Sequence, residues 1–130
     1  MTRKPRTREA VDFGNSAAGA LPFSPAVYAG KVLYLSGQVG VDPESGALVR
    51  GGVGAEVDQI FRNISAVLAA AGKDLGDVVK ANVYLAHMDD YAAMNEAYAR
   101  AFDKPYPART CIGVAALPLG ARVEIEVIVR

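Results

Sequence analysis

An arginine and two glutamates stand in strongly apolar segments near the C-terminus of this chain. Residues 107–114 and 122–129 both alternate between apolar and other side chains, which is typical of β-strands, and Leu-Pro-Leu-Gly at 117–120 marks a turn between them. One face of the two strands would carry Thr110, Ile112, Val114, Val123, Ile125, Val127 and Val129. The opposite face would carry Arg109, Cys111, Gly113, Glu124 and Glu126 together.

These charged residues admit two interpretations. In the first, Arg109 and a glutamate form a cross-strand ion pair on a solvated sheet face, which contributes little to stability. In the second, they form a site for a small anionic molecule. A guanidinium can bind a carboxylate through two parallel hydrogen bonds, and a neighbouring carboxylate can orient a water or accept a proton.

The composition sets limits on the class of protein. A chain of 130 residues with 52% hydrophobic and 22% charged residues is expected to form one globular domain. Its net charge of zero argues against nucleic acid as a partner, and no apolar run reaches the length of a membrane span. The single cysteine excludes an internal disulfide and suits a reducing cytoplasm, and one histidine with one cysteine leaves no zinc-ligand set.

The N-terminal residues 1–10 are rich in basic side chains and are interpreted as a flexible tail, with a single domain over 11–130. A short strand is expected to begin at Val11 and Phe13. Residues 26–35 predict two strands around a tight turn at Gly30-Lys31, and residues 42–46 predict another turn.

Two helices and a further strand are expected in the second half of the chain. Residues 55–71 repeat apolar side chains at helical spacing, and Gly72 stands where a C-terminal cap belongs. Residues 78–86 alternate as a strand, followed by His87, which we interpret as structural. A second helix is expected to begin at an N-cap of Asp89 or Asp90 and to reach Phe102.

Asn95 is the polar residue on an otherwise aromatic stripe of this second helix. Tyr91, Tyr98 and Phe102 share the stripe with it. The asparagine could bond to backbone within the core, or it could form the wall of a pocket. The order of elements predicts an α+β sandwich with two helices on one face of a mixed sheet, and a semi-polar second face left open.

Several motifs, in order, resemble the Rid proteins (reactive intermediate deaminases, also called YjgF or L-PSP proteins). The resemblance rests on Pro-Ala-Arg-Thr-Cys at 107–111 and Val-Glu-Ile-Glu-Val at 123–127. It extends to Pro-Phe-Ser-Pro-Ala-Val at 22–27, Leu-Ser-Gly-Gln at 35–38, the segment 71–80 and Met-Asn-Glu-Ala-Tyr at 94–98. The matching motifs cover nearly the whole chain.

The resemblance implies a chorismate-mutase-like (YjgF-like) fold, a homotrimer with sites in the clefts between subunits, and hydrolysis of 2-imino acids to 2-oxo acids and ammonia without metal or cofactor. It implies that Arg109 binds the substrate carboxylate, assisted by the backbone N–H of Cys111, and that Glu124 positions or activates water. Gly37, Asn95 and Phe23 would line the cleft. Deaminating members carry tyrosine where this chain has Phe23, so a hydroxyl that could bond substrate or water is missing.

Other functions stay open at this point. A regulatory trimer that binds small carboxylates without turnover would use the same Arg109 and Glu124. A ribonuclease role, attached to some relatives, is disfavoured by the neutral charge. Cys111 is interpreted as a packed or rim thiol and not as a nucleophile, because no histidine is near it in the sequence.

Overall fold

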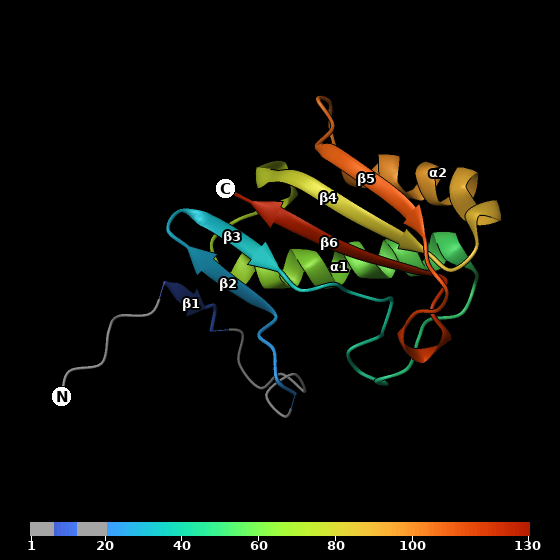
Figure 1. Ribbon diagram of the computed structural model, residues 1–130, viewed down its shortest axis with the longest axis horizontal. Coiled ribbons are helices and arrows are strands. Elements are labelled where there is room, and N and C mark those ends of the chain that lie inside the picture. The colour runs from blue at the N-terminus through green and yellow to red at the C-terminus, as the bar shows by residue number, and fades with distance from the viewer. Residues whose placement is uncertain (1–6, 13–20) are drawn as a thin grey trace.

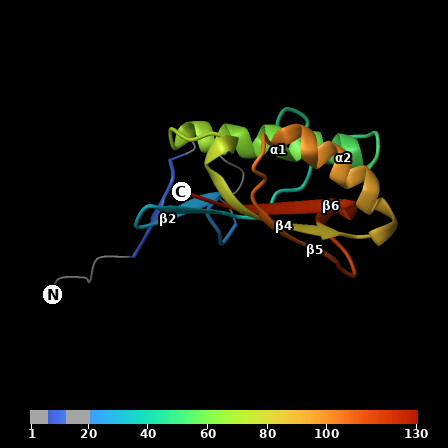
Figure 2. The ribbon, with the colours of Figure 1, turned by 90° about the horizontal axis from the view of Figure 1, so that it is seen from above.

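The computed structural model describes residues 7–12 and 21–130, in which two α-helices cover one face of a six-stranded sheet (Figures 1 and 2). Figure 2 shows the two helices as one layer and the strands as the other. The predicted α+β fold class, with both helices on one side of a mixed sheet, is therefore confirmed.

The sheet has the strand order β1-β2-β3-β6-β4-β5. Its strands are β1 (Arg8–Ala10), β2 (Ala26–Ala29), β3 (Val32–Leu35), β4 (Val78–Leu85), β5 (Ala108–Gly113) and β6 (Val123–Val129). The β4–β5 pair is parallel and the other pairs are antiparallel. A parallel pair needs a crossover connection, and the helix α2 (Tyr91–Ala101) supplies it between β4 and β5.

The core lies between α1 (Val53–Ala70) and the central strands. The apolar stripe of α1 is buried, as its spacing predicted, and it packs with the inner residues of β4 and β6. Gly72 follows the helix with a φ of 70°, a left-handed conformation that glycine adopts without steric cost. Short 3₁₀ turns, η2 (Leu75–Asp77), η3 (Met88–Asp90) and η4 (Pro118–Gly120), connect the larger elements.

The predicted arrangement of the two C-terminal strands was wrong in two respects. First, β5 and β6 are not neighbours, because β4 lies between them. Second, β5 is turned over: the register aligns Arg109 with Ala81, and Cys111 with Val83, both of which are buried under the helices. Thr110 and Ile112 therefore face the open side, and Ile112 is 47% exposed.

For β6 the predicted faces were right. Val123, Ile125, Val127 and Val129 are all buried against the helices. Glu124 and Glu126 consequently lie on the open face, opposite to Arg109 and Cys111. The expectation that one face would carry all four of these residues is thus incorrect.

Two expectations at element boundaries also change. Arg8–Ala10, which we assigned to the N-terminal tail, form β1 and pair with residues 27–29 of β2, while residues 1–6 and Phe13 lie outside the described residues. Asp90 stands at the N-cap of α2 but makes no capping bond with its side chain, because its carboxylate pairs with Arg122 at 3.0 Å.

Candidate active site

Arg109 extends from β5 toward α2, where side chains of that helix hold its guanidinium. Nη1 donates to Asn95 Oδ1 at 2.7 Å, and Nη2 donates to the Tyr91 hydroxyl at 3.1 Å. The guanidinium carbon lies 4.9 Å from the centre of the Tyr98 ring, within cation–π range. The aromatic stripe of α2 therefore fixes the orientation of the one charged group that β5 presents to this helix.

This contact decides between the two interpretations of Asn95. Its side chain does not bond to core backbone but accepts from Arg109, and both residues line a cavity of about 300 Å³ with Tyr98, Ala99, Tyr106 and Pro107. Among the described residues, no carboxylate lies within ion-pair distance of Arg109, since the two ion pairs there are Arg100–Asp58 and Arg122–Asp90. A half-buried guanidinium without an anionic partner is suited to bind an anionic ligand.

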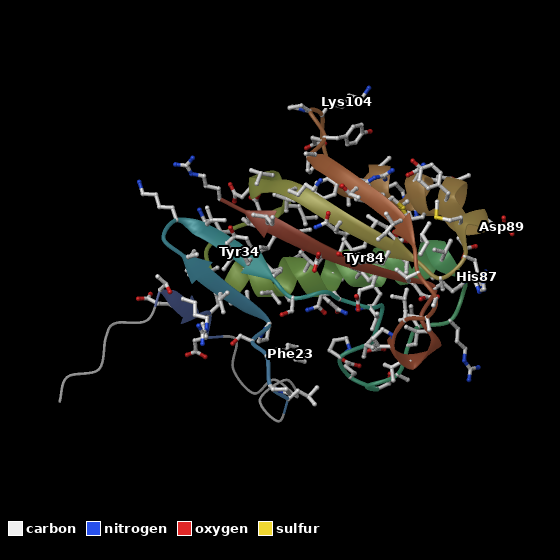
Figure 3. All side chains as sticks on the ribbon, in the orientation of Figure 1. Phe23, Tyr34, Tyr84, His87, Asp89 and Lys104 are labelled. Carbon is white, nitrogen blue, oxygen red and sulfur yellow. The ribbon has the colours of Figure 1, made fainter. Side chains whose placement is uncertain are left out.

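Glu124 belongs to a different cavity, of about 430 Å³, on the open side of the sheet. Leu21, Phe23, Ser36, Gly37, Val39 and Pro118 form its other walls. Phe23 is 51% exposed and projects from the chain that leads into β2 (Figure 3). Burial raises the pKa of the Glu124 carboxyl above its ordinary value, and the negative charge of Glu126 raises it further. A carboxylate of raised pKa is a stronger proton acceptor than a solvated one.

Gly37 makes room for the Glu124 carboxylate. A Cβ at position 37 would lie 2.9 Å from Glu124 Cδ and 3.0 Å from its Oε2, closer than side-chain atoms approach one another. The glycine sits in a segment joined to β6 by two hydrogen bonds between Gln38 and Ile125, of 2.9 and 3.0 Å. The predicted cleft residues Phe23 and Gly37 are thus brought together with Glu124.

Cys111 lies two residues beyond Arg109 on β5, half-buried against the core. Burial raises the pKa of its thiol, and the nearby Arg109 charge only partly opposes this. The thiol form therefore dominates at neutral pH, which does not favour a nucleophile. Val114 donates its N–H to Leu85 of β4. Because N–H directions alternate along a strand, the N–H of Cys111 points to the free edge of β5.

The structure brings the predicted residues into two half-sites and not one. Arg109 and Asn95 form the first, under α2, and Phe23, Gly37 and Glu124 form the second, on the open face. Sequence reasoning missed that Tyr91 and Tyr98 contact Arg109, although their place on the Asn95 stripe was the available signal. His87 is exposed and lies beyond the end of β4 (Figure 3).

A second missed group surrounds Glu126. Its Oε1 accepts from the Tyr84 hydroxyl at 2.5 Å and from Asn82 Nδ2 at 3.2 Å. The polar alternation of β4 was visible in the sequence, but its register with β6 was not. A further cavity of about 780 Å³ lies between η2 and the connection from α2 to β5, but it contains neither Arg109 nor Glu124.

Two negative findings concern the described part of the chain, 7–12 and 21–130. No helix there is long and apolar enough to cross a membrane. No group of three or more His, Cys, Asp or Glu side chains in that part is arranged to hold a metal ion.

Residues 14–130 match the family model described as Endoribonuclease L-PSP. The 2-iminobutanoate/2-iminopropanoate deaminase of Capra hircus is 46% identical over 121 residues, which cover 93% of this chain and 88% of the goat protein. The human protein of the same name is 47% identical over 113 residues, covering 86% and 82% of the two chains. The crystal structure of RidA from an Antarctic Psychrobacter superposes with a TM-score of 0.82 at 43% identity, covering 96% of this chain and 98% of that one. This chain therefore belongs to the Rid (YjgF/L-PSP) family.

Proposed function

We propose that this protein hydrolyses 2-imino acids, or their enamine tautomers, to 2-oxo acids and ammonia. The observation that carries the proposal is the half-buried guanidinium of Arg109, which faces a cavity without an anionic partner among the described residues. The similarity to proteins named 2-iminobutanoate/2-iminopropanoate deaminase supports this substrate class. Such substrates, formed by pyridoxal-phosphate enzymes, carry the carboxylate that Arg109 would bind.

The complete site would form between two copies of the chain. Arg109 and Glu124 lie on opposite faces of the same sheet, so one substrate molecule cannot contact both within one chain. The open face also exposes Ile112 and Tyr34, large apolar side chains that a second copy would cover. A closed ring in which the Arg109 half-site of each copy meets the Glu124 half-site of the next unites these residues. By family resemblance this ring is a homotrimer, and the lone cysteine fits a cytoplasmic location.

The proposed reaction uses an anion-binding group, a backbone donor and one carboxylate. Arg109 binds the substrate carboxylate through two hydrogen bonds, with the outward N–H of Cys111 as a further donor. Glu124 of the neighbouring copy accepts a proton from a water as the water oxygen attacks the electrophilic carbon of the protonated imine. As the resulting amino alcohol collapses, Glu124 gives its proton to nitrogen, the C–N bond breaks to release ammonia, and the hydroxyl proton passes by way of Glu124 to the released ammonia, which leaves the 2-oxo acid and ammonium. Holding water and iminium together supplies most of the rate enhancement.

A binding module without turnover is the second candidate, and Phe23 is the observation that favours it. The ring closes the apolar wall beside Glu124 but offers no hydroxyl to the substrate or the water. Such a module would keep the Arg109 clamp and bind 2-oxo acids, whose carboxylate is the same, without competing for imines.

Competition for a trapped imine distinguishes the two candidates. An amino-acid oxidase or threonine dehydratase generates the imine, semicarbazide traps it, and a deaminase lowers the yield of the trapped product. We expect wild type to compete and Arg109→Ala to lose at least about 100-fold in kcat/KM, because the substrate carboxylate loses its charged partner. Arg100→Ala, which removes an exposed arginine paired with Asp58, is the matched control and keeps its rate. A wild type that binds 2-oxo acids but never competes would establish the binding module instead.

A further inference from the structure

Glu126 is a half-buried carboxylate that the proposed reaction does not use. It stands two residues from Glu124 on β6, and both side chains project from the open face of the sheet. Strand geometry places their Cα atoms roughly 6.5 Å apart. Unlike Glu124, Glu126 does not line the cavity of Phe23 and Gly37.

The position of Glu126 is fixed by two donors from β4. The Tyr84 hydroxyl and the Asn82 amide both bond to the same carboxylate oxygen, at 2.5 and 3.2 Å. Tyr84 also lies directly opposite Glu124 in the strand register. Figure 3 labels Tyr84 over the middle of the sheet. These two hydrogen bonds hold the Glu126 carboxylate in place on the open face, beside Glu124.

The other charged and titratable groups of this face do not cancel that charge at Glu124. Lys80 of β4 directs its ammonium to Thr110 of β5, at 2.9 Å. Tyr34 of β3 is paired with Ile128, further along β6. The remaining walls around Glu124, from residues 21–23, 36–39 and Pro118, contain no titratable side chain. Arg122, two residues before Glu124, directs its guanidinium to Asp90 at 3.0 Å. In the proposed ring, the Arg109 of the neighbouring copy is paired with the substrate carboxylate. Among the described residues of one chain, Glu126 and Tyr84 are therefore the titratable groups next to Glu124 that have no cationic partner of their own.

We propose that Glu126 is a positioning residue for the reaction: anchored by Tyr84 and Asn82, it places a fixed negative charge beside Glu124 and keeps Glu124 basic enough to take a proton from water near neutral pH. This inference rests on the proposed deaminase function. It assigns a role to a carboxylate that contacts no substrate and acts only through Glu124. The raised pKa of Glu124, to which Glu126 contributes after burial, agrees with it.

Glu126→Gln removes the charge and keeps the shape of the side chain. If the two carboxylates are as far apart as their Cα atoms, roughly 6.5 Å, a unit charge at Glu126 shifts the pKa of Glu124 by about half a unit to two units, for effective dielectric constants from about 80 to 20. We expect the pKa of Glu124 to fall by that amount. The acidic limb of the pH profile of kcat/KM should shift to lower pH by the same amount. The plateau value of kcat/KM should fall, because Glu124 becomes a weaker base.

Tyr84→Phe and Glu44→Gln complete the set of variants. Tyr84→Phe removes one anchor but retains the charge, so the limb should move less than in Glu126→Gln. Glu44→Gln removes a carboxylate from the exposed turn at 42–46 and should leave the profile unchanged.

The pKa of Glu124 can be read without any activity, from ¹³Cδ-glutamate NMR titration with Glu124→Gln for assignment. A wild type that hydrolyses imines while Glu126→Gln leaves both the Glu124 titration and the acidic limb in place overturns the proposal and leaves the deaminase function standing. The proposed role is also overturned if Tyr84→Phe shifts the acidic limb of the kcat/KM profile as far as Glu126→Gln does. It is overturned as well if Glu126→Gln shifts the Glu124 titration seen by NMR but not the acidic limb. A wild type without imine hydrolysis, tested first, overturns the proposed function and this role with it.

Discussion

Replacing Gly37 with alanine should lower activity while sparing the fold. The added Cβ would lie 2.9 Å from Glu124 Cδ, and ordinary contact begins at 3.4 Å, so the two atoms must separate by about 0.5 Å. The backbone at 37 cannot retreat easily, since Gln38 is joined to Ile125 by two hydrogen bonds. The carboxylate, at the end of a flexible side chain, moves instead.

Because the Glu124 carboxylate moves and the backbone does not, we expect a small effect on stability and a large effect on kcat. Gly37 has no positive φ, so alanine adds no backbone strain, and the free energy of unfolding should change by no more than about 1 kcal/mol. If Glu124 activates the water as proposed, displacement of its carboxylate by a fraction of an ångström should lower kcat by about 10- to 100-fold. KM should change little, because Arg109, the proposed binding group for the substrate carboxylate, is untouched.

Steady-state imine hydrolysis and thermal unfolding measure both effects on the same samples. Gly54→Ala is the matched control: it lies in α1, has open space around its Cβ position, and should keep full activity. A Gly37→Ala protein with wild-type kcat would refute the assignment of Glu124 as the group that handles the water. A protein that fails to fold would refute the argument that only the carboxylate has to move.

Three further substitutions test other parts of the site and fold. Arg109→Lys should raise KM by about 10- to 100-fold in steady-state kinetics, because an ammonium cannot form the paired bonds of a guanidinium. Cys111→Ser should keep kcat/KM within about threefold, since the proposed mechanism uses the backbone N–H and not the thiol; a loss like that of Arg109→Ala would contradict this. Glu56 is 3% exposed, and burial raises the pKa of its carboxyl above the ordinary value of 4.5. The folded state therefore favours the protonated carboxyl, and its contribution to the free energy of unfolding is lost as pH rises from about 4.5 through the raised pKa. Glu56→Gln, which can still accept from the Arg122 N–H, should abolish this loss in urea titrations at pH 4 and pH 8.

The spacing of apolar residues correctly predicted the buried face of those elements that pack directly against the core. The stripe of α1 and the inner residues of β6 were correct, because both elements are packed under one continuous core. The stripe of α2 also grouped Asn95 with Tyr91 and Tyr98 correctly, and all three contact Arg109.

The same reasoning failed for β5 because β5 is an edge strand. Ile112 was assigned to the core for its apolar side chain, yet it faces the open side that a second copy would cover. The insertion of β4 between β5 and β6 depends on a parallel pairing through α2, which no local pattern contains. Family resemblance gave Arg109 and Glu124 as candidate site residues, but only the register showed that they lie on opposite faces.

Mixing two inactive variants tests whether one active site takes Arg109 and Glu124 from different copies. By the proposed mechanism, Arg109→Ala and Glu124→Gln should each disable every site of a pure assembly. In a ring assembled at random from equal amounts of both, about one interface in four joins an intact Arg109 to an intact Glu124. Co-expressed or co-refolded mixtures should therefore recover about a quarter of wild-type activity. Recovery of none, in mixtures shown to contain both chains in one assembly, would contradict a site shared between copies.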